Sequence, residues 1–337
     1  MKAKKIIKIA YCVIFFLALA VPGVMTFTSE NKTIGNEEKI SRLENFGFRN
    51  ELINLNNEIY YNVFGQSGED SVIAGSDGWL FYESALHDYT GSEVLSTEEI
   101  AQIAQSVKDM EYSVRAQGAE FVFVVAPNKM EIYGEYMPYY TVASKEDGNY
   151  ELLMDALDKA GVTYTDLKSE LLAAKENKEL SLYHRLDSHW NNIGASIAYE
   201  TIMDKVEKGH TVYDGVAYDT RCDFDGDLYS MLFPMGTKKD YQHYYNVEEN
   251  FYYTSRFHGA DDLYISTENE MGSGSVLVFR DSFGNALYPF FANDFAKADF
   301  SRALPYDVTE VEEYDVVVVE IVERNIANLL EYVPVTK

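Results

Sequence analysis

The stretch FVFVVA, residues 121–126, decides the fold. It is a continuous apolar run of strand-forming residues, which predicts a strand that is buried on both faces of a parallel sheet. Similar runs recur near the C-terminus at 275–279 (SVLVF) and 316–321 (VVVVEI). Strands of this kind that alternate with helical patterns are typical of a doubly wound sheet. We therefore predict an α/β protein with a mostly parallel sheet that helices cover on both sides.

Local signals place the helices around these strands. A Ser-x-x-Glu capping box at Ser96 predicts a helix that runs to about Ala116. Asp77 and Gly78 separate two short apolar runs and predict a β-hairpin within 71–82. The remaining patterns predict short strands at 162–166 and 182–183 and helices at 150–160, 168–175, 194–206, 283–293 and 326–332.

Ser282 lies directly between the strand 275–279 and the helix 283–293. Its hydroxyl should therefore lie at the carboxyl edge of the sheet, where open α/β sheets bind their ligands. Backbone amides at a helix N-terminus can stabilise an oxyanion there. The alternative is that Asp281 or Ser282 is an ordinary helix cap. We take Ser282 as a candidate nucleophile.

A nucleophilic serine needs a base, and Asp187 and His189 provide the best candidate pair. A carboxylate two residues from an imidazole can fix the tautomer of that imidazole. The alternative is a half-buried histidine without a catalytic role, next to a Trp190 that packs in the core. We predict Ser282 as nucleophile, His189 as base and Asp187 as orienting acid, with the amide of Ser282 or Phe283 as oxyanion donor.

Two further loops at the same sheet edge contain weaker candidates. Asn128 and Lys129 follow the strand 121–126, and Arg324 follows the strand 316–321. Because ligands gather beyond the carboxyl ends of strands, these residues are candidates for substrate or oxyanion contacts. The alternative for Lys129 is a solvated lysine in a turn.

A metal site competes with serine chemistry, because His184, Asp187 and His189 resemble a ligand cluster. The two histidines lie five residues apart in an expected loop, and the other histidines form no second cluster. We therefore favour serine chemistry and predict neither a metal nor another cofactor. Cys12 and Cys222 lie in different environments, so no disulfide is expected.

The composition limits the partners. The chain has 337 residues, 47% of them hydrophobic, which suffices for a real core. A net charge of -27 excludes a broad nucleic-acid surface, because most faces would repel a phosphate polyanion. The acidity is compatible with a neutral glycan or a cationic partner, or it serves only to keep an exported protein soluble.

The N-terminus has the pattern of a membrane anchor. Four lysines lie within residues 2–8, and residues 9–27 contain no charge. About twenty apolar residues span a bilayer, and basic residues before them keep the N-terminus cytoplasmic. The sequence Ala18-Leu19-Ala20 offers signal cleavage, and hence secretion, as the alternative. We favour a retained anchor, because the apolar run continues past that site.

We therefore divide the chain into an anchor at 1–27, a stalk and leading helix at 28–70 and a catalytic domain at 71–337. Residues 209–272 interrupt the α/β pattern and are rich in aromatic residues. Such side chains could stack on sugar rings, or they could pack an irregular β insertion. The aromatic residues concerned are Tyr229, Phe233, Tyr241, Tyr244, Tyr245, Phe251, Tyr252, Tyr253, Phe257 and Tyr264.

These motifs together resemble a known family. The chain is similar to the SGNH-hydrolase-like O-acetyltransferases of the AlgX and AlgJ type, and especially to the related DHHW proteins of Gram-positive bacteria. The resemblance covers about residues 45–330, and the order of the blocks makes it fairly specific. In chain order, the blocks are FR at 48–49, GSDGWLFY at 75–82, PNK at 127–129 with Tyr133 and Pro138, DSHWN at 187–191, GDL at 226–228, RDSF at 280–283 and ER at 323–324.

The resemblance implies a three-layer α/β/α fold with a rearranged motif order, in which the Asp and His of a Ser-His-Asp triad precede the serine. It implies acetyl transfer to an extracytoplasmic polysaccharide, with acetyl groups supplied by a membrane-bound O-acyltransferase. On this chain the triad falls on Ser282, His189 and Asp187. The letters of the name DHHW correspond to residues 187–190, so Ser188 takes the place of the first histidine. The inferred base, His189, corresponds to the second histidine and is present. Arg280 stands where the family usually has glycine, so the oxyanion hole should differ in detail.

Two other functions stay open at this point. An acetyl-esterase would use the same triad with water as the acceptor. A non-catalytic glycan-binding or assembly subunit would keep the fold and the aromatic insertion and would not need Ser282.

Overall fold

The computed structural model describes residues 13, 15–16, 49–144, 146–177 and 180–337. Almost all of the predicted anchor at 1–27 and the stalk up to residue 48 lie outside the described residues. Among the residues that are described, no helix is both long enough and apolar enough to span a membrane. The chain divides into two compact units, and the smaller one includes 49–68 and 232–237.

The smaller unit contains the described part of the leading helix, α3 (Arg49–Ile59), which continues into the short π-helix η1 (Tyr60–Phe64). Asn57 on α3 is buried, and its side-chain amide donates to the carbonyl oxygen of Leu232 at 2.7 Å. The rings of Tyr61 and Phe233 meet edge to face at 5.6 Å. These contacts attach 232–237 to the helix although the two segments are far apart in the sequence.

The larger unit is built on a seven-stranded sheet in the order β4-β3-β11-β9-β10-β8-β7. Four neighbouring pairs are parallel, and the pairs β10-β8 and β7-β8 are antiparallel. The sheet is therefore mixed: its parallel part agrees with the prediction of a mostly parallel sheet, and the antiparallel strands β7 and β8 at one edge were not predicted. The strands are β3 (Glu120–Ala126), β4 (Tyr164–Thr165), β7 (Tyr252–Tyr253), β8 (Tyr264–Glu268), β9 (Ser275–Phe279), β10 (Lys297–Ser301) and β11 (Val316–Val322).

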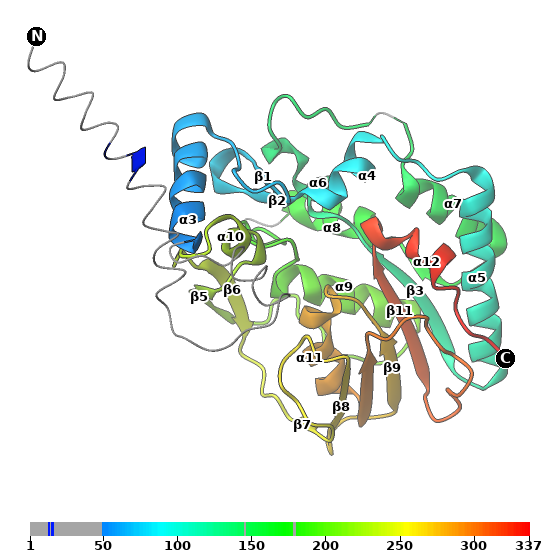
Figure 1. The fold of residues 1–337 in the computed structure, drawn as a ribbon. Helices are drawn as coiled ribbons and strands as arrows, with labels where there is room; N and C mark the ends of the chain where they lie inside the picture. Colours follow the sequence, from blue (N-terminus) through cyan, green and yellow to red (C-terminus); the bar gives the residue numbers. More distant parts are fainter. Residues whose placement is uncertain (1–12, 14, 17–48, 145, 178–179) are drawn as a thin grey trace, which may run out of the picture. The chain divides into compact units, whose positions relative to one another are not determined.

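Helices cover both faces of this sheet, as Figure 1 shows. Successive side chains of a strand point to opposite faces. Thus Val316 and Val318 enter one core cluster, and Val317 and Val319 enter the other. The first cluster packs against α6 (Lys129–Tyr133), α8 (Leu167–Asn177), α9 (Asn192–Lys205) and α11 (Gly284–Asp294), and the second against α5 (Thr97–Ala116), α7 (Asn149–Ala160) and α12 (Asn328–Glu331). The result is a three-layer α/β/α arrangement.

The local signals were largely correct. Ser96 caps α5 through a complete capping box with Glu99. The predicted hairpin pairs β1 (Val72–Ala74) with β2 (Leu80–Tyr82), and Asp77 between them has a φ of 52°, which aspartate tolerates better than most residues. The predicted strand at 182–183 is reduced to a single bridge between Tyr183 and Trp190.

The aromatic-rich segment forms a β hairpin and the edge of the main sheet. β5 (Tyr218–Phe224) pairs antiparallel with β6 (Asp240–Tyr245), and α10 (Asp227–Leu232) lies between them in the sequence. β7 and β8 extend the main sheet. The short helices that complete the unit are η2 (Ser76–Gly78), η3 (Glu83–Ala85), α4 (Leu86–Thr90), η4 (Gly134–Tyr136) and η5 (Glu323–Asn325).

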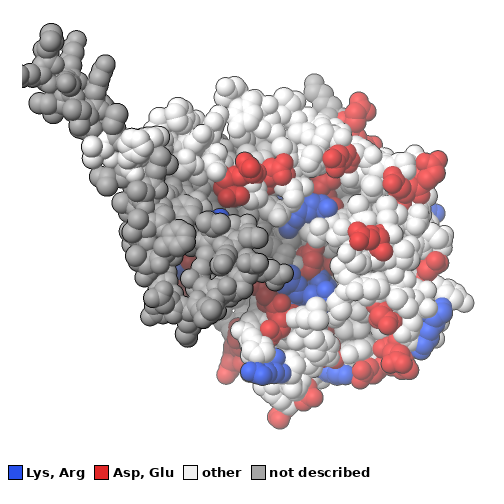
Figure 2. Space-filling view, in the orientation of Figure 1, with Lys and Arg blue, Asp and Glu red and all other residues white. Residues whose placement is uncertain are grey.

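Acidic side chains are spread over the face of the molecule in Figure 2, with fewer lysines and arginines among them. This distribution agrees with the net charge of -27.

Candidate active site

The loop that contains Asp187 and His189 is fastened to the sheet at two points. At its base, Tyr183 pairs with Trp190 in an antiparallel bridge. The Tyr183 hydroxyl donates to the Pro127 carbonyl just after β3, at 2.7 Å. The Trp190 indole N–H donates to the Phe283 carbonyl at 3.0 Å. The loop is thereby held against the carboxyl edge of the sheet, next to the turn that contains Ser282.

The turn between β9 and α11 is held by Asp281. One carboxylate oxygen of Asp281 accepts the Phe283 N–H at 2.9 Å, and the other accepts the Val322 N–H at 2.7 Å. Asp281 therefore fixes the turn and ties the end of β9 to the end of β11. Neither Asp281 nor Ser282 is the N-cap of α11, which is Phe283 without a side-chain cap. The hydroxyl of Ser282 is left for another partner.

That partner is His189. The Ser282 Oγ lies 2.8 Å from Nε2 of His189, and Nδ1 of the same ring lies 2.7 Å from Oδ1 of Asp187. The structure thus brings together the three residues that the sequence selected, from two segments separated by 93 positions between His189 and Ser282. A hydroxyl, an imidazole and a carboxylate in this order can perform nucleophilic acyl chemistry.

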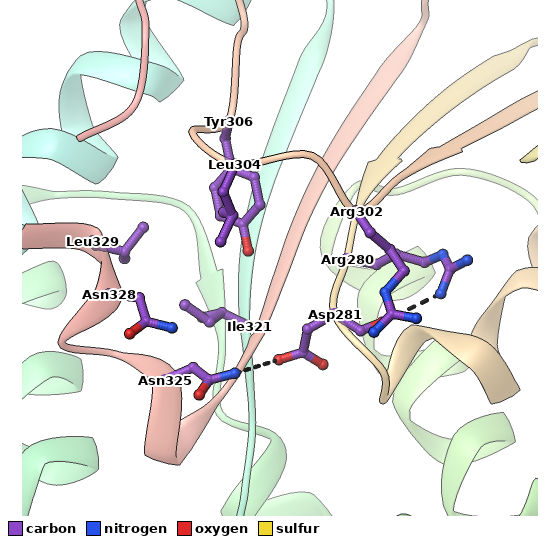
Figure 3. A pocket seen from close by; sticks show the side chains of 9 residues that line it. All are labelled: Arg280, Asp281, Arg302, Leu304, Tyr306, Ile321, Asn325, Asn328 and Leu329. Carbon is purple, nitrogen blue, oxygen red and sulfur yellow. Dashed lines mark hydrogen bonds between the residues drawn. The ribbon is translucent and has the colours of Figure 1, made fainter. Parts of the chain in front are cut away.

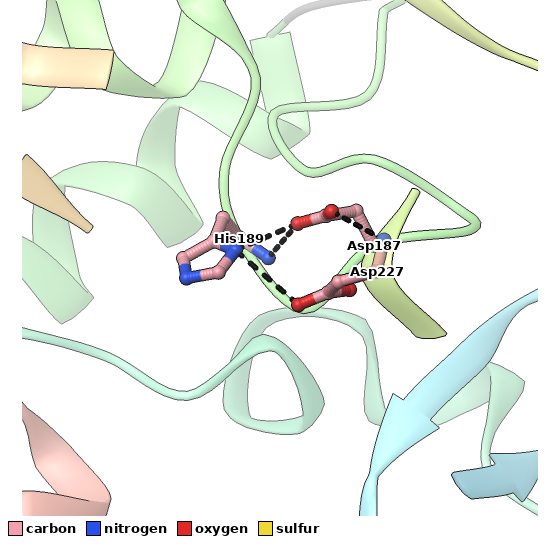
Figure 4. A group of neighbouring side chains, drawn as sticks. All are labelled: Asp187, His189 and Asp227. Carbon is pink, nitrogen blue, oxygen red and sulfur yellow. Dashed lines mark hydrogen bonds and ion pairs between the residues drawn. The ribbon is translucent and has the colours of Figure 1, made fainter. Parts of the chain in front are cut away.

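The Asp187 carboxylate is held by several donors, as Figure 4 shows. Oδ1 also accepts the His189 backbone N–H at 2.9 Å, and Oδ2 accepts the Asp227 N–H at 2.8 Å. Burial alone would raise the pKa of the Asp187 carboxyl. The hydrogen bond and charge of His189 and the Asp227 amide outweigh burial and hold this pKa below its ordinary value.

The imidazole of His189 is affected in the opposite sense. Burial alone would lower its pKa, but the hydrogen bond and the charge of Asp187, with a smaller contribution from Asp227, raise the pKa above the ordinary 6.5. The pair therefore favours a protonated imidazole next to an ionised carboxylate. This is the charge state that a base reaches after it has taken a proton from a serine.

Asp227 is a site residue that the sequence analysis did not select. Its Oδ2 accepts the Ser188 hydroxyl at 2.5 Å and lies 3.6 Å from Nδ1 of His189. Burial, followed by the charge of Asp187, raises the pKa of the Asp227 carboxyl. The sequence signal that could have pointed to Asp227 was the block GDL at 226–228. Its glycine lies against the Asp187 loop, because a Cβ on Gly226 would lie 2.3 Å from the Leu186 carbonyl oxygen. Only glycine permits this close approach.

Among the residues that the structure describes, the group of side chains that could hold a metal differs from the predicted one. Ligand atoms of Asp187, His189 and Asp227 lie within 4.8 Å of one another, whereas His184 is not part of the group. Both oxygens of Asp187 and Oδ2 of Asp227 already accept hydrogen bonds. A metal would have to displace these donors, so the arrangement suits an orienting hydrogen-bond network better than a metal site.

His184 lies in the packing behind the loop. Its side chain is 2% exposed, and its ring stacks on Phe224 with 3.8 Å between ring centres. Burial lowers the pKa of His184 to about 4, so the ring is neutral near pH 7.

Lys129 is buried below the loop and does not point into solvent. Its ammonium donates to the carbonyl oxygens of Leu80, Arg185 and Asp187, at 2.6, 3.1 and 2.8 Å. An ammonium has three protons, so these carbonyls use all of them. Burial lowers the pKa of Lys129 to about 7. The contacts favour a role in positioning the Asp187 loop over the substrate contact that the sequence suggested.

Asn128 and Arg324 lie together at the ends of β3 and β11. Asn128 is fully buried, and its side-chain amide donates to Asp88 at 2.9 Å. Its Oδ1 accepts from Arg324 at 3.4 Å. The Arg324 guanidinium lies 5.5 Å from the centre of the Phe283 ring, and its positive charge acts to lower the pKa of His189. Of these two candidates, the partly exposed Arg324 is the better placed for a substrate.

The backbone amides near Ser282 differ from the prediction in one respect. The Phe283 N–H is used by Asp281, so it is not free to hold an oxyanion. In the described part of the chain, the amides of Ser282 and Gly284 have no acceptor. These two amides at the start of α11 are the available oxyanion donors, and the sequence analysis had not considered Gly284.

Arg280, which directly precedes Asp281 and Ser282, is 1% exposed. A Cβ on Gly284 would lie 2.6 Å from Cβ and Cδ of Arg280, so the large side chain requires a glycine one turn later. Figure 3 shows the cavity of about 150 Å³ beside this turn. It is lined by Arg280, Asp281, Arg302, Leu304, Tyr306, Ile321, Asn325, Asn328 and Leu329.

Solved structures with the same fold cover most of the chain. A DHHW family protein from Eubacterium siraeum superposes with a TM-score of 0.56 and 16% identity, over 79% of this chain and 99% of that one. PatB1 of Bacillus cereus gives 0.58 and 18%, over 76% and 96%. The O-acetyltransferase domain of Pseudomonas putida AlgJ gives 0.51 and 20%, over 76% and 92%. At these identities the similarity shows the fold.

Sequence relatives match a smaller part of the chain. A probable alginate O-acetylase AlgJ of Pseudomonas putida is 29% identical over 141 residues, which are 42% of this chain and 35% of the relative. The corresponding protein of Pseudomonas syringae is 26% identical over 208 residues, 58% of this chain and 51% of the relative. The chain thus matches about half or less of the length of these relatives.

The family model for the SGNH hydrolase-like domain of the acetyltransferase AlgX matches residues 72–247, more than half of the chain. The match contains Asp187, His189 and Asp227 and ends before Ser282. The motif order, the three-layer fold and this match agree, and the chain belongs to the AlgX family of SGNH hydrolase-like acetyltransferase domains.

Proposed function

We propose that this protein is an O-acetyltransferase that acts on a cell-surface or secreted polysaccharide through an acyl-serine intermediate. The observation that carries the proposal is the 2.8 Å contact between Ser282 Oγ and His189 Nε2, in line with the 2.7 Å contact between His189 and Asp187. The family and the relatives named alginate O-acetylases support the reaction class.

In the first half-reaction, Nε2 of His189 takes the proton of the Ser282 hydroxyl as Oγ attacks the carbonyl carbon of an acetyl donor. The tetrahedral oxyanion is held by the amides of Ser282 and Gly284 at the N-terminus of α11. The leaving group then takes the proton from His189, and an acetyl ester remains on Ser282. Asp187 keeps Nδ1 of the imidazole protonated throughout, so that Nε2 is free to accept.

In the second half-reaction, a sugar hydroxyl takes the place of the leaving group. His189 accepts the hydroxyl proton as the sugar oxygen attacks the acetyl-serine, and it returns a proton to Ser282 when the ester transfers. The net change moves one acetyl group from the donor to the glycan and regenerates the enzyme.

The proposal includes a place for this reaction in the cell. We propose that the N-terminal segment anchors the protein, with the body outside the cytoplasm, and that a membrane-bound O-acyltransferase supplies the acetyl groups. The basic residues before the uncharged run at 9–27 support this orientation. Protease treatment of intact cells should degrade the body, and protection of the body would contradict this location.

The test uses an activated acetyl ester as a small donor. Wild-type protein should show a burst of product and should gain the mass of one acetyl group on the peptide that contains Ser282. Ser282→Ala should lose both signals, whereas Ser169→Ala, at an exposed serine on α8, should keep both. An unchanged burst in Ser282→Ala would exclude Ser282 as the nucleophile.

Product analysis distinguishes transfer from hydrolysis. With a polysaccharide present, a transferase should form acetylated glycan at the expense of free acetate. Free acetate alone, with and without glycan, would identify an acetyl-esterase that uses the same residues with water as acceptor.

A further inference from the structure

We infer that the acceptor glycan binds in an aromatic cavity lined in part by α9 and α11, the helices that follow His189 and Ser282, and that its sugar units carry no acidic group. The inference rests on the proposed acetyl transfer, because it names the class of acceptor for the same site. The cavity has a volume of about 360 Å³. Its lining consists of Asn192, Tyr213, Phe224, Gln242, Tyr244, Tyr245, Val247, Glu249, Ala286, Pro289, Phe290 and Asn293.

The cavity is lined in part by the two helices that directly follow the candidate catalytic residues in the sequence, α9 after His189 and α11 after Ser282. Asn192 is the first residue of α9 and follows His189 by three positions. Ala286 lies in α11, four positions after Ser282, which corresponds to about one helical turn. α9 packs against both α11 and β6, as Figure 1 shows. A chain of sugars in this cavity would therefore lie against the two helices whose N-terminal ends follow the base and the nucleophile.

Five aromatic side chains line the cavity, and two of them have one ring face already covered. Phe224 stacks on His184, with the ring planes inclined by 6°. Tyr244 lies under the guanidinium of Arg221 at 4.7 Å. Each ring thus has one face occupied, while its side chain still lines the cavity. A ring face of this kind, together with polar groups at its edge, suits the apolar face of a sugar ring.

Amide side chains provide the polar part of the lining. The Asn192 side-chain N–H donates to the His243 carbonyl at 2.8 Å, and the Asn192 backbone N–H donates to Gln242 Oε1 at 3.1 Å. These bonds fix the orientation of Asn192. Among the described residues, no donor faces its Oδ1, so this oxygen is available to accept a sugar hydroxyl.

The charges around the cavity select against acidic sugars. The lining contains the exposed carboxylate of Glu249 and neither lysine nor arginine. Arg221 lies over Tyr244 outside the lining, and Asp219 lies 3.7 Å from its guanidinium. A uronic acid would bring a second carboxylate towards Glu249 without a cation to compensate, on a chain with a net charge of -27. The relatives are named for alginate, a polymer of uronic acids, so we infer a different acceptor class here.

The first experiment measures glycan binding by isothermal titration calorimetry to Ser282→Ala protein, which cannot turn the ligand over. The probes are uncharged tetrasaccharides built from glucose, mannose or N-acetylglucosamine, and an alginate tetrasaccharide. At least one uncharged probe should bind about tenfold or more tightly than the alginate probe, since tenfold corresponds to about 1.4 kcal/mol. Equal or tighter binding of alginate, or no binding of any uncharged probe, would overturn the inference.

Matched variants locate the binding. Tyr244→Ala should weaken the uncharged probe about tenfold, as expected for the loss of one aromatic contact. Tyr241→Ala removes a 60% exposed tyrosine from the same strand, outside the lining, and should leave affinity unchanged. Glu249→Lys should improve alginate binding about fivefold or more, and Glu248→Lys, next to it but outside the lining, should not. Equal effects within either pair would place the glycan elsewhere.

Thermal unfolding checks that each variant folds. The acetyl-ester burst of the wild-type protein tests the proposed function separately. A burst without binding of any uncharged glycan would support the proposed acetyl transfer and reject this acceptor class. Binding of an uncharged glycan without a burst would support the glycan site and reject the acetyl transfer.

Discussion

Two buried carboxyl groups contact the residues around Ser282, and their pKa values are shifted in opposite directions. Asp187 accepts the His189 imidazole and two backbone N–H groups, and its pKa lies below the ordinary value. Glu320 on β11 is fully buried and accepts the Asp281 N–H at 3.1 Å. Burial, followed by the charge of Asp281, raises the pKa of Glu320 well above its ordinary value.

The comparison shows that donors, and not depth, decide which carboxyl group stays charged. Both side chains are at most 4% exposed. Asp187 has an imidazole that can carry the opposite charge, and Glu320 has another carboxyl group, that of Asp281, as its neighbour. The negative charge is therefore favoured on Asp187, next to the imidazole that must become positive, and disfavoured on Glu320.

The largest effect on activity is expected from Asp187→Asn, which replaces the ionised carboxylate beside His189 with a neutral amide. The imidazole would lose its orienting acceptor, so we expect kcat for acetyl transfer to fall by about 10³ to 10⁴. The wild-type rate should rise with pH through the pKa of His189, which lies above 6.5, because only the neutral ring can take a proton. In Asp187→Asn this rise should move to lower pH, because the main cause of the raised pKa is lost. A rate and pH profile like those of the wild type would contradict the proposed role.

A smaller effect is expected from Asp227→Asn. Asp227 contributes less than Asp187 to the raised pKa of His189 and contacts it mainly through Ser188. We expect kcat to fall only about three- to tenfold, with the acid limb of the rate profile moving to lower pH by less than in Asp187→Asn. Steady-state rates over the same pH range check both points. A loss as large as that in Asp187→Asn would give Asp227 an equal role in orienting the base.

The smallest effect on activity is expected from Glu320→Gln. Burial and the charge of Asp281 favour the protonated form of the wild-type carboxyl, so a neutral amide of the same shape should change the transfer rate by less than about twofold. Stability should respond differently. A raised pKa means that the folded protein holds a proton that the unfolded chain releases above about 4.5, so the wild-type protein loses stability as pH rises above that value.

The variant Glu320→Gln has no carboxyl group at this position, so it should not lose stability for this reason as the pH rises. Its free energy of unfolding, relative to that of the wild-type protein, should therefore increase between about pH 5 and about pH 8 in urea titrations. A relative stability that falls with pH would mean that Glu320 is ionised, and the contrast with Asp187 would then fail.

Much of the fold could be predicted because its central strands are apolar without interruption. The run 275–279 coincides with β9, and the runs 121–126 and 316–321 each lie within one residue of β3 and β11. The sequence did not predict the strand β10, because Asp299 lies at its centre. Asp299 is buried there and accepts a hydrogen bond from the Tyr314 hydroxyl. A charged residue in a five-residue strand conceals the apolar pattern.

The candidate site could be predicted in part for a related reason. Asp187, His189 and Ser282 each follow a recognisable local rule, so the sequence could select them before their contacts were known. Asp227 gave only the weak signal of the block GDL at 226–228, because it binds Asp187 through its backbone amide and lies 40 positions away. A main-chain contact leaves no trace in the residue type. The antiparallel strands β7 and β8 were likewise hidden, because their short segments have little apolar periodicity.

The position of β11 has a consequence for the order in which the protein matures. β11 follows all the other described strands of the sheet in chain order, yet it lies between β3 and β9 in the sheet. Until it is inserted, β3 has no link to the half of the sheet that carries Ser282, and long-range strand pairing of this kind is slow. During synthesis or export, the chain should therefore gain its ability to be acetylated only after β11, residues 316–322, has emerged and paired with β3 and β9.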